Sequence, residues 1–265
     1  MYSSFEIAKK YLRYFINAKD RKGHGMHSPF VFDFIIHVLN DKKKYECYAM
    51  IEPLRKQLLS DETIIEIEDF GAGSAIMPSN KRKINAIARS SLKSKKFAKL
   101  LFRIVNYYKP KTVIELGTSF GITTSYMASG EHHPEIYTLE GSKEIGKIAE
   151  RNFSKLNLQN INLLLGNFKD TFISTLDKIE FVDLAFVDGN HRKNATLQYF
   201  FELEKKSTPA SIFIFDDIHW SEEMEQAWRE IQRQPSVTLT IDLFFIGLVF
   251  FSPDFKEKQH FTIRF

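Results

Sequence analysis

The sequence contains one cysteine, Cys47, among its 265 residues. A lone cysteine excludes an intrachain disulfide and a cysteine-based metal cluster, and it fits a reducing compartment. Long hydrophobic runs are also missing, because the longest one, residues 243–251, is too short to span a bilayer as a helix. The first ten residues lack the apolar stretch of a signal peptide. These absences predict a cytoplasmic protein with no membrane span.

Charge of one sign is in little excess, since the formal net charge is +4 and the lysines and arginines are spread along the chain. Nucleic-acid binding would favour a denser basic patch on one element. Hydrophobic residues make up 43% and charged residues 26%, as in ordinary soluble globular proteins. The composition argues against disorder and disfavours a nucleic-acid partner. It says nothing about oligomeric state.

Residues 1–95 are predicted to form a mainly helical N-terminal extension, followed by a cofactor-binding domain at 96–265. Apolar side chains within residues 5–18 follow the spacing of one helix face. The glycine-containing turns at 21–29 and 69–74 are candidate lids over an acceptor site. Other expected elements are helices at 30–39, 51–59 and 84–107, and a short strand at 63–67.

After residue 110, short apolar runs alternate with helical stretches. This alternation predicts an α/β fold, in which a mostly parallel sheet has helices on both faces. Two final apolar runs joined by a tight turn predict an antiparallel C-terminal edge pair. The expected strands are residues 112–116, 136–139, 161–165, 182–187, 211–215, 237–243 and 247–251.

Two glycine loops, at residues 69–74 and 115–121, resemble nucleotide-binding turns. Such a turn needs a strand before it, a helix after it and an acid roughly 20 residues further on. The second loop meets these conditions, because Glu140 ends the next predicted strand 23 residues after Gly117. The first loop is followed by Pro78 and lacks a suitably spaced acid. We therefore predict the cofactor loop at 115–121.

The residues of this loop suit a cationic cofactor. Gly117 and Gly121 lack Cβ atoms, so the backbone can approach a ligand closely. Glu115 can accept hydrogen bonds around an amino-acid group, and Glu140 can accept from both hydroxyls of a ribose. A pyrophosphate would be repelled by Glu115 and would favour Gly-x-Gly-x-x-Gly, which this loop lacks. The pattern indicates S-adenosylmethionine rather than a nicotinamide dinucleotide.

Residues 112–251 resemble the Rossmann-like class I methyltransferases. Residues 113–121 are similar to the first motif of that family, and residues 137–140 to its second strand with the ribose-binding acid. The resemblance implies that Thr118 and Ser119 also contact the cofactor, and that Asn167 lies where the family contacts adenine. It also places Asp188 at the end of the fourth strand, beside the cofactor.

Within that class, the pattern is closest to the metal-dependent O-methyltransferases of the catechol and caffeoyl-CoA type. The resemblance implies that Asp188, Asp216 and Asp217 hold a divalent cation such as Mg²⁺, although the family has Asn where this chain has Asp217. His191 stands where the family has its catalytic lysine. A neutral imidazole there can act as general base near pH 7.

The function expected is therefore metal-assisted O-methylation of a small-molecule hydroxyl, with S-adenosylmethionine as methyl donor. Three alternatives stay open: a metal-independent N- or O-methyltransferase, a non-catalytic S-adenosylmethionine- or RNA-binding module, and a nicotinamide enzyme. His24 and His27 superficially resemble a metal tract, but no third ligand follows nearby.

Overall fold

The computed structural model describes residues 1–19, 28–67 and 80–265. They form two compact units, of which unit 1 contains Met1–Asp41 and Ile179–Phe265, and unit 2 contains Lys42–Lys178. The glycines of both candidate lid turns, together with His24 and His27, lie outside the described residues. No helix in the described part of the chain is long and apolar enough to cross a membrane. The division at residues 95 and 96 stays a prediction.

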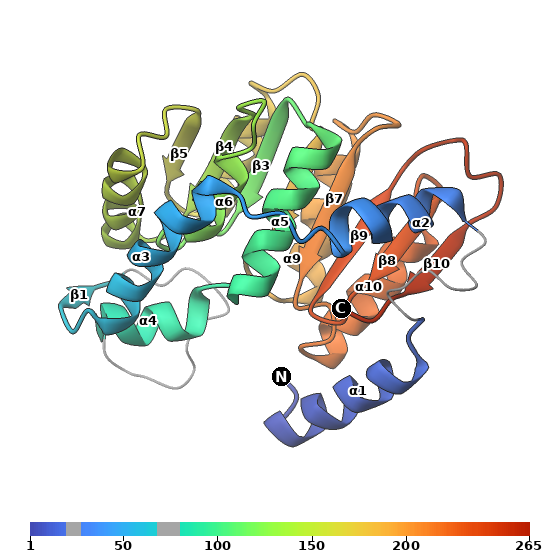
Figure 1. The fold of residues 1–265 in the computed structure, drawn as a ribbon, viewed down its shortest axis with the longest axis horizontal. Coiled ribbons are helices and arrows are strands. Elements are labelled where there is room, and N and C mark those ends of the chain that lie inside the picture. The colour runs from blue at the N-terminus through green and yellow to red at the C-terminus, as the bar shows by residue number, and fades with distance from the viewer. Residues whose placement is uncertain (20–27, 68–79) are drawn as a thin grey trace. The chain divides into compact units, whose positions relative to one another are not determined.

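Unit 2 contains three parallel strands, with β4 (Glu135–Glu140) between β3 (Thr112–Leu116) and β5 (Ile161–Leu165) (Figure 1). The β3 side chains of Val113, Ile114 and Leu116 have no exposed surface. Such continuous apolar runs are typical of parallel strands covered on both faces. The carboxyl ends of β3 and β4 lie at one edge, because Leu116 is in register with Leu139.

Helices α3 to α7 of unit 2 contribute buried side chains to one apolar cluster. Ile51 and Leu58 of α3 belong to the same cluster as Phe102 of α5 and Tyr126 of α6. Residues before the first sheet strand therefore contribute to this core. The elements are α3 (Glu46–Ser60), α4 (Ile84–Ser91), α5 (Lys95–Tyr108), α6 (Ile122–Ala128), α7 (Lys143–Lys155), α8 (Phe168–Leu176), and an antiparallel pair of β1 (Ile64–Glu66) and β2 (Lys81–Lys83).

Unit 1 contains five strands in the order β10-β8-β9-β7-β6. Neighbours β6 and β7 are parallel, as are β8 and β10, whereas β9 is antiparallel to both β7 and β8. Val187 pairs with Phe215, so the acids that follow these two residues lie at one edge. The strands are β6 (Leu184–Val187), β7 (Ile212–Asp216), β8 (Leu239–Asp242), β9 (Ile246–Phe250) and β10 (Gln259–Thr262).

Helix α1 (Ser4–Asn17) packs within unit 1 through one of its faces. A capping box formed by Ser3 and Glu6 begins the helix. Lys10 forms an ion pair with Glu225 at 2.8 Å, and Tyr11 contacts Phe244 edge-on at 5.1 Å between ring centroids. The other helices of unit 1 are α2 (Pro29–Phe34), the π-helix η1 (Ile35–Leu39), α9 (Lys193–Glu204) and α10 (Glu222–Arg233).

The prediction of an α/β fold with a mostly parallel sheet and an antiparallel pair near the C-terminus is confirmed. Three details differ. Strand β10 was not predicted, and it lies outside the β8–β9 pair. The expected helix at 84–107 is two helices, because residues 92–94 leave helical geometry and the Arg55 guanidinium donates to Lys93 O at 2.5 Å. The short strand at 63–67 exists, but its partner β2 was not predicted.

Candidate functional site

The turn after β3 is a tight backbone loop in unit 2. The amides of Gly117 and Thr118 both donate to Leu139 O, at 3.0 and 3.1 Å. Gly117 has φ 105° and Gly121 has φ 74°, values that favour glycine. Gly121 is the N-cap of α6, and a Cβ there would lie 2.4 Å from Phe153 Cε1. The predicted cofactor loop is therefore a strand–turn–helix junction that needs glycine.

Glu140 is fixed at the end of β4 by backbone amides. Ser119 N donates to Glu140 Oε2 at 2.8 Å, and Ser142 N donates to Oε1 at 2.9 Å. Burial raises the pKa of Glu140, while these amide hydrogen bonds act in the opposite direction. A carboxylate offers about four acceptor sites, and because the Gly141 amide also bonds to Glu140, part of this capacity remains for a further donor. The structure thus brings Ser119 and Glu140 together, as the sequence predicts.

Glu115 is fully buried beside the same turn. Its Oε2 accepts from Thr124 Oγ1 at 2.5 Å and from Thr138 Oγ1 at 2.6 Å. Its Oε1 is buried without a hydrogen-bond partner among the described residues. Burial raises the pKa of this carboxyl to about 7. Because Glu115 has no exposed surface, a ligand would reach it only through water or after a side-chain shift.

Sequence reasoning missed three hydroxyl side chains around this turn. Thr124 and Thr138 bind Glu115, and Thr138 Oγ1 also lies 2.6 Å from Thr118 Oγ1. Ser91 Oγ lies 2.8 Å from Ser119 Oγ. Each of the three looks like an ordinary helix or strand residue, so no spacing signal could have identified it.

Asn167 follows β5 in unit 2. Its side chain caps α8 by accepting from Lys169 N at 3.0 Å. Gly166, with φ 139°, donates its amide to Glu140 O at 2.9 Å. This backbone bond ties the loop after β5 to the end of β4, beside the Glu140 carboxylate. The adenine contact predicted for Asn167 remains a prediction.

A second cluster of predicted residues lies in unit 1. Asp188, His191 and Asp216 each offer one ligand atom, and these atoms all lie within 4.8 Å of one another. His191 Nε2 is 3.7 Å from Asp188 Oδ1 and 4.0 Å from Asp217 Oδ2. Asp216 is 1% exposed. The structure therefore brings all four unit 1 candidates together, with His191 between two aspartates.

Asp217 has a backbone unlike that of its neighbour. Its φ is 53°, a left-handed value that aspartate tolerates better than most residues. Its amide donates to Phe245 O at 2.7 Å, and its carbonyl accepts from Trp220 N at 2.9 Å. Asp217 is not in the group whose ligand atoms lie within 4.8 Å of one another. The predicted ligand set is thus close in space, but Asp217 is at its margin.

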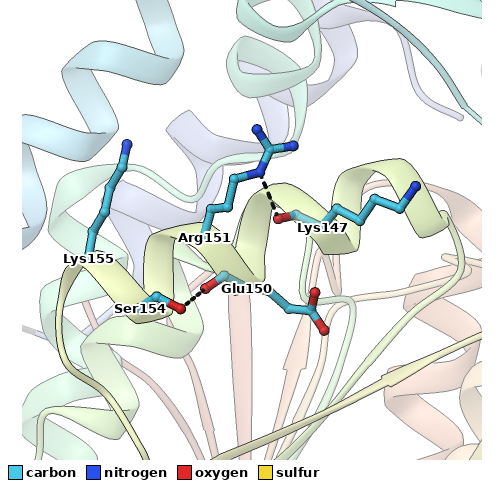
Figure 2. Close-up of a pocket in the computed structure, with 5 residues that line it drawn as sticks. All are labelled: Lys147, Glu150, Arg151, Ser154 and Lys155. Atoms are coloured by element: carbon cyan, nitrogen blue, oxygen red, sulfur yellow. Dashed lines mark hydrogen bonds between the residues drawn. The ribbon is translucent and has the colours of Figure 1, made fainter.

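A groove on α7 contains none of the predicted site residues. It is lined by Lys147, Glu150, Arg151, Ser154 and Lys155, which lie along the outer surface of one helix (Figure 2). Arg151 Nε donates to Lys147 O at 3.3 Å, and Lys147 pairs with Glu144. This is a solvated charged helix face with internal ion pairs, and we do not place the chemistry there.

One family model matches the middle part of the chain. Residues 114–218 match a family model described as a methyltransferase domain. A comparison with curated protein sequences gives no match.

Similar solved structures share the fold at low sequence identity. An O-methyltransferase from Bacillus cereus in complex with SAH is 20% identical, with a TM-score of 0.56 over 79% of this chain and 92% of that chain. An SAH-bound methyltransferase from Podospora anserina is 14% identical, with a TM-score of 0.58 over 95% and 98%. An O-methyltransferase from Streptomyces achromogenes involved in tomaymycin synthesis, in complex with SAM, is 16% identical, with a TM-score of 0.55 over 84% and 95%. The chain has the fold of these methyltransferases, and its residues 114–218 match the model of a methyltransferase domain.

Proposed function

We propose that this protein transfers a methyl group from S-adenosylmethionine to an oxygen of a small molecule, assisted by a divalent cation. The observation that carries the proposal is the Glu140 carboxylate, which two backbone amides fix beside the glycine turn after β3. The similar structures from Bacillus cereus and Streptomyces achromogenes are O-methyltransferases in complex with SAH and SAM, respectively. The single cysteine, Cys47, supports a cytoplasmic location.

The residues of the turn fit this cofactor. The remaining acceptor capacity of Glu140 suits the ribose hydroxyls, and the bare backbone at Gly117 and Gly121 allows close approach of a ligand. Ser119 Oγ and the Thr118 backbone are also proposed to contact the cofactor. Glu115 adds a second buried carboxyl, whose Oε1 lacks a partner among the described residues. Asn167 is proposed to contact the adenine.

Binding tests this assignment. Glu140→Ala should weaken S-adenosylmethionine binding by about 1–3 kcal/mol, the scale of losing charged hydrogen bonds to two hydroxyls. Calorimetry on the full chain measures it. Glu135→Ala is the matched control, because Glu135 is an exposed acid at the other end of the same strand. Equal affinities for the wild-type protein and both variants would remove Glu140 from the site.

The proposed reaction is a displacement at the methyl carbon, with the acceptor oxygen held near a divalent cation. When bound, S-adenosylmethionine supplies a methyl carbon on a positively charged sulfur, and the carbon–sulfur bond breaks, its electron pair going to sulfur, as the acceptor oxygen attacks. A divalent cation would supply charge that favours the deprotonated acceptor, whose proton would pass to solvent water. Asp188 and Asp216 are the carboxylates that we propose to hold it. Positioning supplies much of the rate in such a displacement.

His191 supports a metal-free alternative. Its Nε2 lies 3.7 Å from Asp188 Oδ1 and 4.0 Å from Asp217 Oδ2. Carboxylates at these distances orient an imidazole and stabilise its protonated form, so His191 could accept the acceptor's proton as a general base. In that case Asp188 and Asp217 would only position it.

A transfer assay separates the two forms. Radiolabelled S-adenosylmethionine is incubated with a panel of hydroxylated and aminated small molecules, with and without EDTA. The proposal expects label on oxygen and its loss with EDTA. Transfer that survives EDTA but fails in His191→Ala supports the metal-free form. Label only on nitrogen, or on none of the panel, contradicts O-methylation.

A further inference from the structure

The cluster in unit 1 differs in ligand chemistry from the three-carboxylate set that the sequence predicts. We propose that His191 is a direct metal ligand, so that Asp188, His191 and Asp216 form a mixed nitrogen–oxygen site that prefers Mn²⁺, Co²⁺ or Zn²⁺ to Mg²⁺ or Ca²⁺. This inference rests on the proposed function only for the role of the ion in methyl transfer. Binding of the ion to the site can be tested without methyl transfer.

The strand register places the three ligands. Val187 of β6 pairs with Phe215 of β7, so Asp188 and Asp216 are the next residues on two parallel neighbours. His191 follows three residues after Asp188, in the loop that leads into α9. One carboxylate is thus at the end of a rigid strand, and the other two ligands come from one short loop. This is a preformed arrangement on adjacent elements of the same unit.

The distances suit a single ion. All three ligand atoms lie within 4.8 Å of one another, and His191 Nε2 is 3.7 Å from Asp188 Oδ1. Metal–nitrogen and metal–oxygen bonds of about 2.0–2.2 Å put neighbouring ligand atoms about 3–4 Å apart. Small side-chain adjustments are sufficient to reach that geometry. Exposed fractions of 14% for the Asp188 side chain and 27% for His191 leave a path for the ion.

Charge also favours this set. Two carboxylates this close repel each other unless a cation or a proton sits between them. Asp216 is 1% exposed, so water screens it little. Asp188 and Asp216 together carry two negative charges, which a divalent ion neutralises, and the neutral imidazole adds a ligand without adding charge.

Asp217 is not among the proposed ligands. Its Oδ2 lies 4.0 Å from His191 Nε2, and it is outside the mutually close group. Its φ of 53° is left-handed, so its backbone does not continue the strand that ends at Asp216.

The nitrogen ligand decides the metal class. Carboxylate and water ligands suit Mg²⁺, Ca²⁺ and Mn²⁺, whereas imidazole suits Zn²⁺ and the later transition metals. Replacing one oxygen of a three-carboxylate set by His191 Nε2 therefore shifts the preference away from Mg²⁺ and Ca²⁺. Mn²⁺ accepts both ligand types and serves as a spectroscopic probe.

Metal titrations of the full chain test the proposal with two matched variants, His191→Ala and Asp217→Ala. We expect the wild-type protein to bind Co²⁺ and Zn²⁺ at least about tenfold more tightly than Mg²⁺. His191→Ala should lose at least about tenfold in Co²⁺ and Zn²⁺ affinity and little in Mg²⁺ affinity, while Asp217→Ala, which removes no ligand, should change each by less than about threefold. Pulsed EPR of bound Mn²⁺ should show a nitrogen coupling that disappears in His191→Ala.

Three results of the metal titrations would overturn the proposal. Loss of binding in Asp217→Ala with retention in His191→Ala would establish the three-carboxylate set, and so would tighter binding of Mg²⁺ than Co²⁺. Absence of binding by every ion removes the site. Circular dichroism and S-adenosylmethionine affinity of the variants show whether they are folded. If the nitrogen coupling is found but no methyl transfer occurs, the metal site stands and only the proposed function fails.

Discussion

Gly121→Ala is the substitution that tests the glycine turn most directly. Gly121 has φ 74°, and a Cβ there would lie 2.4 Å from Phe153 Cε1, 2.6 Å from Phe153 Cζ and 3.2 Å from Ala149 Cβ. Ordinary carbon–carbon contacts are about 3.5–4.0 Å. Phe153 is a buried ring on α7, so it cannot rotate into solvent to make room. Alanine therefore meets both backbone strain and a steric clash.

The two effects can be sized separately. A non-glycine residue in left-handed geometry costs roughly 1–2 kcal/mol. Overpacking a well-filled core costs roughly 1–3 kcal/mol. Together they predict a loss of about 2–5 kcal/mol from the free energy of unfolding, which for most domains is about 5–15 kcal/mol in total. Gly121→Ala should therefore unfold at a clearly lower urea concentration, or fail to accumulate.

Urea denaturation of the wild-type protein, Gly121→Ala, Phe153→Leu and the double variant separates the two causes. Leucine removes the ring atoms that alanine would strike, so the double variant should recover the steric part, seen as a coupling of about 1–3 kcal/mol. The strain from the positive φ should remain. If Gly121→Ala alone stays within about 0.5 kcal/mol of the wild-type protein, or if the coupling is zero, the turn carries neither the strain nor the clash.

Three further predictions follow from buried groups. Burial raises the pKa of Glu115 to about 7, so the folded state holds this proton more tightly than the unfolded chain does. The stability of the wild-type protein should therefore fall as pH rises between about pH 5 and 8, and Glu115→Gln should gain roughly 1–3 kcal/mol on it over this range. A pH-independent difference between the two proteins in urea titrations contradicts this. A Cβ at Gly247 would lie 2.5 Å from the Trp228 ring, so Gly247→Ala should cost about 1–3 kcal/mol and change the indole fluorescence, and an unaltered spectrum and melting temperature would count against the contact. Residues 96–265 expressed alone should be insoluble, since α3 and α4 supply buried side chains to the core of unit 2; a stable, fully active fragment would disprove that the preceding residues are needed.

Several strands could be predicted from the sequence, because parallel strands that are covered on both faces consist of nearly continuous apolar residues. Residues 112–116 match β3, and residues 211–215 match β7 to within one residue. Strand β10 could not be predicted, because its residues alternate between half-buried and exposed positions and carry little apolar character. The break between α4 and α5 depends on the Arg55 side chain from another helix, and such a tertiary contact leaves no local signal.

The candidate site could be predicted only for residues that lie at a characteristic sequence distance from the glycine turn. Glu140 was found because it ends the strand after the glycine turn. The burial of Glu115 was not, since the contacts from Thr124 and Thr138 come from two different elements. Successive strand residues point to opposite faces, so Asp216 and Asp217 should not both be expected to face one ion. The left-handed turn at Asp217, which decides where its carboxylate goes, is a conformation that residue type alone does not specify.

Unit 1 is assembled from two stretches of sequence that are far apart, with unit 2 lying between them along the chain. Lys19 bridges to Ile263, and the Tyr14 hydroxyl bonds with Ile263 O. During translation at about 5–20 residues per second, the partners of α1 are made roughly 10–45 s after it. Unit 2 can complete its core in that interval, because its segment is continuous. During that time helix α1 has no partner to pack against, so both of its faces are exposed to solvent. Three of its apolar residues, Phe5, Leu12 and Ile16, stay exposed even after folding. Nascent chains of this protein should therefore depend on ribosome-associated chaperones at helix α1 more than at unit 2.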